Sequence, residues 1–291
     1  MQKIIPHLWF DKEAKEAAEF YVSVFGGQSQ ITNVNTLRIP SGDTEVVSFE
    51  LNGYAIEALS AGSYFKLNPS ISFIVHCHSV EEINGLWDRL IDGGSALMPL
   101  DSYDFSERFG WVKDRYGLSW QLILTDQAIS EKIIPSLMFI GEQYGKAEEA
   151  IHFYQSIFNN SSIDFISRYG KGEGNQEGTI KQAIFRLEGQ PIHITENSYH
   201  YQFGFNEAFS LMVYCDTQAE IDYYWEKLSA VPEAEACGWL KDKYGVSWQI
   251  IPTQMAEMMR IKDREKLDRY TQTFLKMKKL DLAELEKAAQ G

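Results

Sequence analysis

The stretch FGWVKDRYGLSWQLIL at residues 109–124 returns almost unchanged as CGWLKDKYGVSWQIIP at residues 237–252. In each copy an apolar segment leads into an Asp-x-Tyr-Gly turn and continues through Ser-Trp-Gln. Such a pattern predicts a β-hairpin, with its tip at Asp114–Gly117 and at Asp242–Gly245. Two copies of so specific a segment predict a duplicated chain.

The beginnings of the two copies match as well. KIIPHLWF (3–10) corresponds to KIIPSLMF (132–139), and EFYVSVFGG (19–27) corresponds to HFYQSIFNN (152–160). The repeat places a boundary at residues 126–131, and 291 residues suit two domains of ordinary size. We therefore expect a first domain over 1–126, a second over 131–252 and a helical tail over 253–291, which caps a sheet or a neighbour.

Each half contains the same series of elements twice. The series is a strand, an amphipathic helix and further strands. We expect strands at 4–10, 71–77, 133–140 and 209–215, each followed by a helix with an apolar stripe of period 3.6. Asn52-Gly53 and Glu188-Gly189 predict hairpin turns. The fold class is therefore α+β, built from four strand–helix–strands modules.

Composition limits the partners. The net charge is −14 and apolar residues make up 44% of the chain, without an apolar run long enough to span a membrane. An acidic surface repels nucleic acid and anionic membranes, so we expect neither as a partner. The beginning of the chain lacks a secretory pattern, so a cytoplasmic location is expected. Cys77, Cys215 and Cys237 have no CxxC spacing and are expected to be reduced thiols, the first two buried at strand ends.

The chain resembles a known family. The paired β-α-β-β-β modules resemble the vicinal oxygen chelate superfamily, which includes glyoxalase I. More narrowly, PHLWFDKEAKEAAEFYVSVFGG, CGWLKDKYGVSWQIIP and the ending MKKLDLAELEKA (277–288) resemble the PhnB-like family, whose members often carry the label 3-demethylubiquinone-9 3-methyltransferase. The residues give that label no support. The glycine-rich segment 170–174 precedes a strand and opens no helix, so it is expected to be a hairpin loop rather than a methyl-donor site.

The resemblance implies a divalent metal inside a half-open sheet. On the family's pattern His7 and Glu57 would be ligands, Glu57 also the catalytic base, and Gln121 the third ligand. The fourth position falls near Ser72, where the family has His, and His76 on the same strand face lies about 13 Å further along. Nitrogen and oxygen ligands would suit Zn, Ni, Fe(II) or Mn.

The second half offers a poorer set of ligands. Ser136 stands where His7 does, His193 where Glu57 does, Ser210 where Ser72 does, and Gln249 matches Gln121. Each ligand also has a structural alternative, since a lone His can simply line a pocket and a repeated Gln can be a structural hydrogen-bonding group. The residues expected in the substrate pocket are Trp9, Ser72, Trp111, His193 and Gln249.

Two functions remain, and they differ in whether a metal takes part. The favoured one is a PhnB-like protein that binds a small molecule in a concave sheet cavity and has a degenerate metal site. The alternative is a metal-dependent glyoxalase- or dioxygenase-type enzyme, in which the metal holds two adjacent oxygens of the substrate. The pairing of modules is also undetermined. In one alternative each half closes its own site. In the other, module one pairs with module four and module two with module three, as in exchanged homodimers. This second pairing would bring Gln249 to His7 and Glu57.

Overall fold

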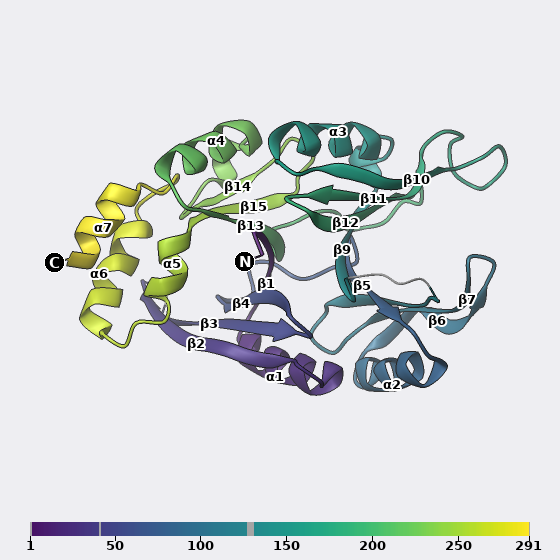
Figure 1. Ribbon diagram of the computed structural model, residues 1–291, viewed down its shortest axis with the longest axis horizontal. Helices are drawn as coiled ribbons and strands as arrows, with labels where there is room; N and C mark the ends of the chain where they lie inside the picture. The colour runs from purple at the N-terminus through teal and green to yellow at the C-terminus, as the bar shows by residue number, and fades with distance from the viewer. Residues whose placement is uncertain (1, 41, 127–130, 291) are drawn as a thin grey trace. The chain divides into compact units, whose positions relative to one another are not determined.

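The computed structural model describes residues 2–40, 42–126 and 131–290, so part of the predicted boundary segment lies outside the described residues. The chain divides into two compact units (Figure 1). Unit 1 combines Met1–Lys66 with Asn206–Gly291, and unit 2 consists of Leu67–Phe205. Each unit contains its own mixed sheet.

Unit 1 is built on a seven-stranded sheet in the order β14-β15-β13-β1-β4-β3-β2. Strand β1 lies at its centre, antiparallel to β13 and parallel to β4. The elements of this unit are β1 (Ile4–Phe10), α1 (Ala14–Phe25), β2 (Gln30–Ile39), β3 (Gly42–Leu51), β4 (Tyr54–Ser60), β13 (Phe209–Cys215), α4 (Gln218–Leu228), η2 (Pro232–Ala234), β14 (Trp239–Lys241), β15 (Ser247–Pro252), α5 (Thr253–Met258), α6 (Arg264–Phe274) and α7 (Leu282–Gln290).

Unit 2 repeats the arrangement on an eight-stranded sheet, β10-β11-β12-β9-β5-β8-β7-β6. Strand β9 takes the place of β1, antiparallel to β5 and parallel to β12. The elements of this unit are β5 (Ile71–Cys77), α2 (Val80–Ile91), β6 (Ser95–Tyr103), β7 (Ser106–Lys113), β8 (Ser119–Leu124), β9 (Ile133–Phe139), η1 (Gly141–Gln143), α3 (Ala147–Ile157), β10 (Ser162–Arg168), β11 (Ile180–Leu187) and β12 (Gln190–Glu196).

The sequence repeats 1–126 and 131–252 do not coincide with these compact units. Unit 1 joins the first module to the fourth, and unit 2 joins the second to the third, which is the exchanged alternative. The fourth module also departs from the expected βαβββ pattern. Ten residues (229–238) connect its helix to β14, whereas the fourteen residues 92–105 of the second module hold a full strand, so only a short 3-10 turn forms here. Both α+β units otherwise have the predicted elements.

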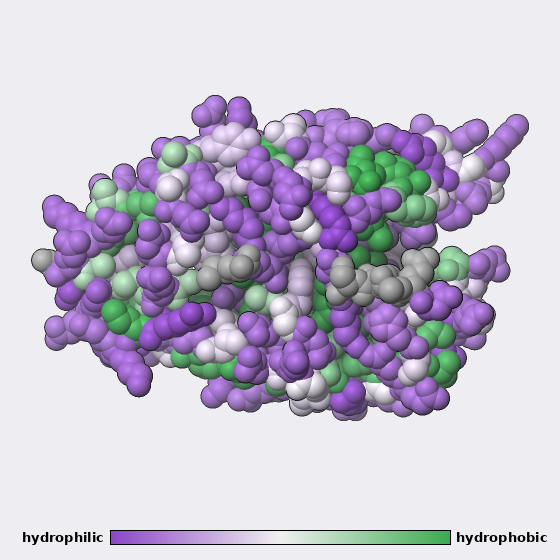
Figure 2. Space-filling model, in the orientation of Figure 1, coloured by the Kyte–Doolittle hydropathy of each residue, from purple (hydrophilic) through white to green (hydrophobic). Residues whose placement is uncertain are grey.

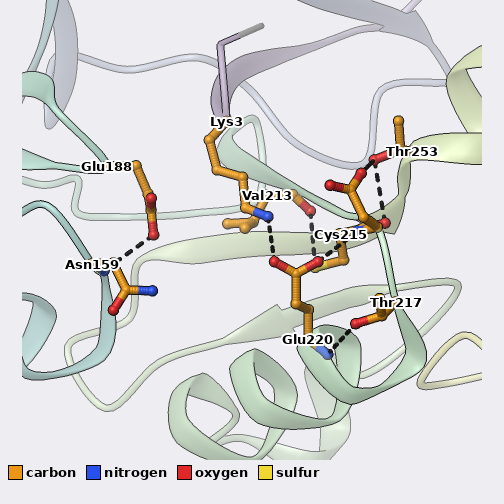
Figure 3. Close-up of polar contacts among 9 residues, drawn as sticks. Lys3, Asn159, Glu188, Val213, Cys215, Thr217, Glu220 and Thr253 are labelled. Carbon is orange, nitrogen blue, oxygen red and sulfur yellow. Dashed lines mark hydrogen bonds and ion pairs between the residues drawn. The ribbon is translucent and has the colours of Figure 1, made fainter.

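Matching contacts hold the two modules of each unit together. In unit 1 the Lys3 ammonium forms an ion pair with Glu220 at 2.8 Å, and Thr217 caps α4 by accepting from the Glu220 N–H (Figure 3). In unit 2 Lys132 forms the same ion pair with Glu82, and Ser79 caps α2. A cap of this kind satisfies one of the unpaired N–H groups at the helix start.

The predicted helical tail is confirmed and packs on the sheet of unit 1. Its helices form an apolar cluster with residues of β1, β2, β13 and β15. The side-chain amides of Asn33 and Asn35, both on β2, donate to the carbonyl oxygen of Met259 at 3.0 and 2.6 Å. The tail is therefore fixed to one face of the sheet by apolar packing and by polar anchors.

The remaining features concern the surface and the cysteines. The surface visible in Figure 2 is largely hydrophilic, with scattered hydrophobic patches. Among the described residues, no helix combines the length and the apolar character needed to cross a membrane. Cys77 and Cys215 are buried free thiols, and burial raises the pKa of each to about 12, so both are protonated and unreactive near neutral pH.

Candidate functional site

A row of polar residues crosses the middle of the unit 1 sheet. Ser48, Glu57, His7 and Ser210 are successive register partners on β3, β4, β1 and β13. Residues in register on neighbouring strands present their side chains on one face of a sheet. The duplicated fold thus brings together groups that are as far apart in sequence as residues 7 and 210.

This row borders a cavity of about 130 Å³ in unit 1. The walls are mainly apolar, and α5 and α6 of the tail close the side opposite the sheet. The lining residues are His7, Leu37, Val46, Ser48, Glu57, Leu59, Met212, Tyr214, Cys237, Trp239, Gln249, Ile251, Met255, Ala256, Met259, Arg260 and Phe274. An apolar cavity with a few convergent polar groups is the usual character of a small-molecule site.

Glu57 is the acidic group of the cavity. Burial raises the pKa of its carboxyl to about 7, while a hydrogen bond from Ser48 Oγ at 2.9 Å and the charge of Arg260 act in the opposite direction. A carboxyl that titrates near neutral pH is present in both protonation states, as a general acid or base requires. The raised pKa also makes Glu57 a candidate functional residue, since such shifts concentrate at sites.

His7 is the basic group beside it. The side chain is buried, and burial lowers its pKa to about 3, so the imidazole is neutral at physiological pH. Its ring meets the Trp239 ring edge to face, with centroids 5.3 Å apart. Nδ1 is buried without a hydrogen-bond partner among the described residues. A buried polar atom of this kind costs free energy unless a water or a ligand completes its hydrogen bond.

The third predicted group comes from the fourth module. Gln249, not Gln121, lines this cavity, and its Nε2 donates to Ser210 Oγ at 2.9 Å. That hydrogen bond leaves the side-chain oxygen of Gln249 for a ligand. Gln121 lies in unit 2, where it donates to Ser72 at 2.8 Å. The predicted set His7, Glu57 and Gln121 is thus divided between two units, because the modules pair in exchange.

The donor set fits a tightly held metal poorly. His7 and Glu57 are good ligands for a divalent ion, but Gln249 and Ser210 complete the set with an amide and a hydroxyl. Across the described parts of the chain, no cluster of three or more His, Cys, Asp or Glu has the geometry to hold a metal ion. Glu57, His7 and Gln249 themselves offer the cavity hydrogen-bonding groups, and Glu57 can also take up or release a proton.

Unit 2 carries the corresponding row with different side chains. Ile184, His193, Ser136 and Ser72 are successive register partners, and Ser136 Oγ lies 2.8 Å from His193 Nδ1. Burial lowers the pKa of His193 to about 4, so this ring is also neutral. His193 lines a separate groove in unit 2, whereas Ser72, although buried in the same sheet, does not line that groove.

The predicted pocket tryptophans stand beside the sites rather than in them. Trp9 packs edge to face against Trp239 with centroids 6.0 Å apart, and its Nε1 donates to the Gly62 carbonyl oxygen. Trp111, the counterpart of Trp239 in unit 2, has a buried Nε1 that lacks a partner among the described residues. Trp239 itself is the tryptophan that lines the cavity.

The sequence-based set lacked the two cavity residues that lower the pKa of Glu57, Ser48 and Arg260. Ser48 was predictable, because a two-residue turn at Asn52-Gly53 pairs Leu51 with Tyr54 and therefore Ser48 with Glu57. Arg260 was not predictable, since it follows α5 in the tail and no repeat or motif connects it with the sheet. The glycine-rich segment 170–174 lies between β10 and β11, as expected for a hairpin loop.

Comparison with known proteins places these features in a family. The family model described as 3-demethylubiquinone-9 3-methyltransferase matches twice in tandem, over residues 2–123 and 131–251. The chain belongs to this family. No curated protein matches the chain at a significant level. The double match confirms the duplication, and the family name is not evidence that this member transfers a methyl group.

Several solved structures are similar to parts or most of the chain. The PhnB protein of Bacillus cereus, provisionally described as a 3-demethylubiquinone-9 3-methyltransferase, is 38% identical over 43% of this chain and 100% of its own, with a TM-score of 0.40. A Pseudomonas aeruginosa protein is 24% identical over 43% and 98%, with a TM-score of 0.38. Glyoxalase I from Zea mays is 11% identical over 90% and 98%, with a TM-score of 0.56, and so shares the vicinal oxygen chelate fold with this PhnB-like chain.

Proposed function

We propose that this PhnB-like protein binds a small molecule in the unit 1 cavity through Glu57, His7 and Gln249, at a metal site that has degenerated. The observation that carries the proposal is the row of polar groups facing an apolar cavity, with a buried His7 Nδ1 that lacks a partner among the described residues. Those groups cost free energy in an apolar environment, and a ligand that completes their hydrogen bonds would offset that cost.

The cavity limits the size of the ligand. Its volume is about 130 Å³, and a dry apolar cavity of roughly 150 Å³ is known to accept benzene. A single ring or a short chain with one or two oxygens therefore fits. Met212, Met255 and Met259 contribute flexible walls that adapt to the shape of such a ligand.

The test uses small aromatic alcohols and acids as probes. Catechol, phenol and benzoate are titrated into the protein while thermal unfolding is measured, since a ligand that binds only the folded state raises the midpoint. We expect at least one probe to stabilise the wild type, Glu57→Gln to weaken that effect, and Asp43→Asn, an exposed acid of β3, to leave it unchanged. Equal stabilisation of the wild type and Glu57→Gln would reject the cavity as the site.

A metal-dependent enzyme of the glyoxalase or dioxygenase type is the second candidate. Two observations favour this enzyme: His7 Nδ1 lacks a partner among the described residues, and His7 is the register partner of Glu57 on the neighbouring strand. Imidazole and carboxylate are ligands that Zn, Ni, Fe(II) or Mn would use. Metal content after equilibrium dialysis separates the two candidates. One equivalent of metal that is lost in both His7→Ala and Glu57→Gln would favour the enzyme, whereas substoichiometric uptake by the wild type favours the metal-free binding protein.

A further inference from the structure

Unit 2 has a second concave site, independent of the unit 1 cavity. An open groove of about 790 Å³ runs along the face of its sheet that carries His193. Isoleucines form most of its floor, and two phenylalanines stand at its walls. The described residues that line it are Ile74, His76, His78, Ser79, Val80, Phe105, Glu107, Ile123, Leu124, Thr125, Asp126, Ile134, Phe165, Gln182, Ile184 and His193.

The floor of this groove corresponds to the surface that the tail covers in unit 1. The repeat aligns Ile74, His76, Ile123 and Ile134 of unit 2 with Met212, Tyr214, Ile251 and Ile5 of unit 1, respectively. All four unit 1 residues are buried in the cluster formed with the tail helices. In unit 2 the equivalent residues line the floor of the groove, where Ile74, His76 and Ile134 are nonetheless buried.

The groove lacks the two asparagines that hold the helical tail in unit 1, so it does not offer the same anchors to the tail of a second copy. The tail is anchored in unit 1 by Asn33 and Asn35, which donate to the Met259 carbonyl oxygen. By strand register, Phe165 stands at the position of Asn33, and Ser167 at that of Asn35. Phe165 is 47% exposed. An apolar ring has therefore replaced an amide that binds backbone, which favours an apolar ligand over a polypeptide.

The charged and polar groups of the groove favour a cation. No lysine or arginine occurs among its described lining residues, whereas Glu107 and Asp126 contribute carboxylates. His76 Nδ1 donates to the Glu131 carbonyl oxygen at 3.1 Å, so in the neutral ring Nε2 is an acceptor for a ligand N–H. Phe105, 58% exposed, and Phe165 offer ring faces, which attract a positive charge.

We propose that the unit 2 groove binds a flat apolar molecule that bears a positive charge, such as an aromatic ammonium. The apolar body lies over the isoleucine floor, and its charged end is directed toward the rings of Phe105 and Phe165. The charged end donates to His76 and faces Glu107 and Asp126. Unit 1 differs in this respect, because Arg260 borders its cavity and opposes a cation.

Three naphthalene probes of one shape and different charge test the proposal. Naphthylmethylammonium, naphthalenemethanol and naphthoate are titrated into the full chain, and binding is followed by isothermal calorimetry. We expect the ammonium to bind more tightly than the alcohol by about two- to fivefold, from its charge over aromatic rings, and the carboxylate to bind most weakly. Naphthoate that binds as tightly as the ammonium, or no measurable binding of the ammonium, would overturn the proposal.

Two variants locate the binding. Phe165→Asn installs the residue found at the equivalent position of unit 1 and should weaken the ammonium by about two- to fivefold. Glu107→Gln should reduce the preference for the ammonium over the alcohol, and Glu177→Gln, an exposed acid of unit 2 outside the groove, should not. Thermal unfolding confirms that each variant is folded. An ammonium affinity that neither variant changes, or dimerisation of the wild type that Phe165→Asn abolishes, would overturn the proposal.

Discussion

Glu57 and His193 occupy the same register position in the two units, and their surroundings give them different chemistry. Glu57 lines the unit 1 cavity with a pKa raised to about 7, whereas His193 is a neutral imidazole bonded to Ser136. The repeat made this pair evident from sequence alone. The protonation states were not evident, because they depend on burial, and burial of Glu57 depends on the tail that covers unit 1.

Glu57 predicts a pH dependence of stability. The folded chain titrates this carboxyl near pH 7, and the unfolded chain near its ordinary value of 4.5. Below pH 4.5 both states hold the proton, so the penalty is absent. As pH rises from about 4.5 to 7 the unfolded state releases its proton first, and the free energy of unfolding falls. We expect a loss of about 1–2 kcal/mol, since partial exposure reduces the full effect.

Urea unfolding of the wild type and Glu57→Gln at several pH values measures this effect. The difference in unfolding free energy between the two proteins should change by about 1–2 kcal/mol between pH 5 and pH 8, with the variant relatively more stable at the higher pH. Asp43→Asn serves as the control on the same sheet. A constant difference between wild type and Glu57→Gln would show that Glu57 has an ordinary pKa.

Replacing Asp242 is expected to lower the stability of the fold rather than to affect ligand binding. Its carboxylate accepts from the backbone N–H groups of Tyr244 and Val246 and from Trp248 Nε1, all within 3.0 Å. Asp114 repeats the pattern in unit 2. Asp242→Asn should lower the free energy of unfolding by about 1–3 kcal/mol, because the amide NH2 replaces one of the two accepting oxygens and cannot accept a hydrogen bond. Chemical denaturation measures it, and an unchanged midpoint would contradict this role.

At the scale of elements, hydrophobic periodicity predicted the strands and helices well. The exception is the fourth module, where the connection after α4 is too short for a strand and η2 forms instead. The repeat suggested an equivalent strand there, but the connecting segment is shorter in the fourth module than in the second, so no strand forms. The docking site of the tail was also beyond the sequence, because Asn33 and Asn35 lie far along the chain from Met259 and no pattern links them.

The hydrogen bonds that anchor the tail predict how readily its helices open locally from the sheet. Replacing both Asn33 and Asn35 by Ala removes the side-chain donors to Met259 and should loosen α5 and α6 by about 1–2 kcal/mol. Hydrogen exchange of residues 253–275 should then quicken, by about tenfold per 1.4 kcal/mol. Val34→Ala, an exposed position between the two on β2, is the matched control. Exchange that stays at the wild-type rate would mean that apolar packing alone holds the tail.

At the scale of the whole chain, the exchange of modules is what the sequence left undetermined. Lys3 binds Glu220 and Lys132 binds Glu82, but the two lysines and the two glutamates stand at equivalent repeat positions. Strands β5 and β13 likewise offer matching buried faces to β9 and β1. Either pairing satisfies the same ion pairs and strand partners, so composition and motif cannot distinguish them. The choice determines whether Gln249 or Gln121 joins His7.

The exchange predicts how separated halves behave. Each unit takes one module from 1–126 and one from 131–291, so neither fragment contains a complete unit. The two fragments, expressed together, should associate as a 1:1 complex that restores both central strand pairings, β1 with β13 and β9 with β5. Their buried strands lack partners otherwise, and an unpaired strand edge associates readily.

Light scattering after size exclusion measures the complex, and Lys3→Glu with Glu220→Lys provides a control that reverses one ion pair while keeping it available. The single change Lys3→Glu should weaken the complex by about 1 kcal/mol or less, since the pair is partly exposed, and the double reversal should restore it. Fragments that remain separate, each folded and monomeric, would show that modules pair within each half, and Gln121 would then return to the site of His7 and Glu57.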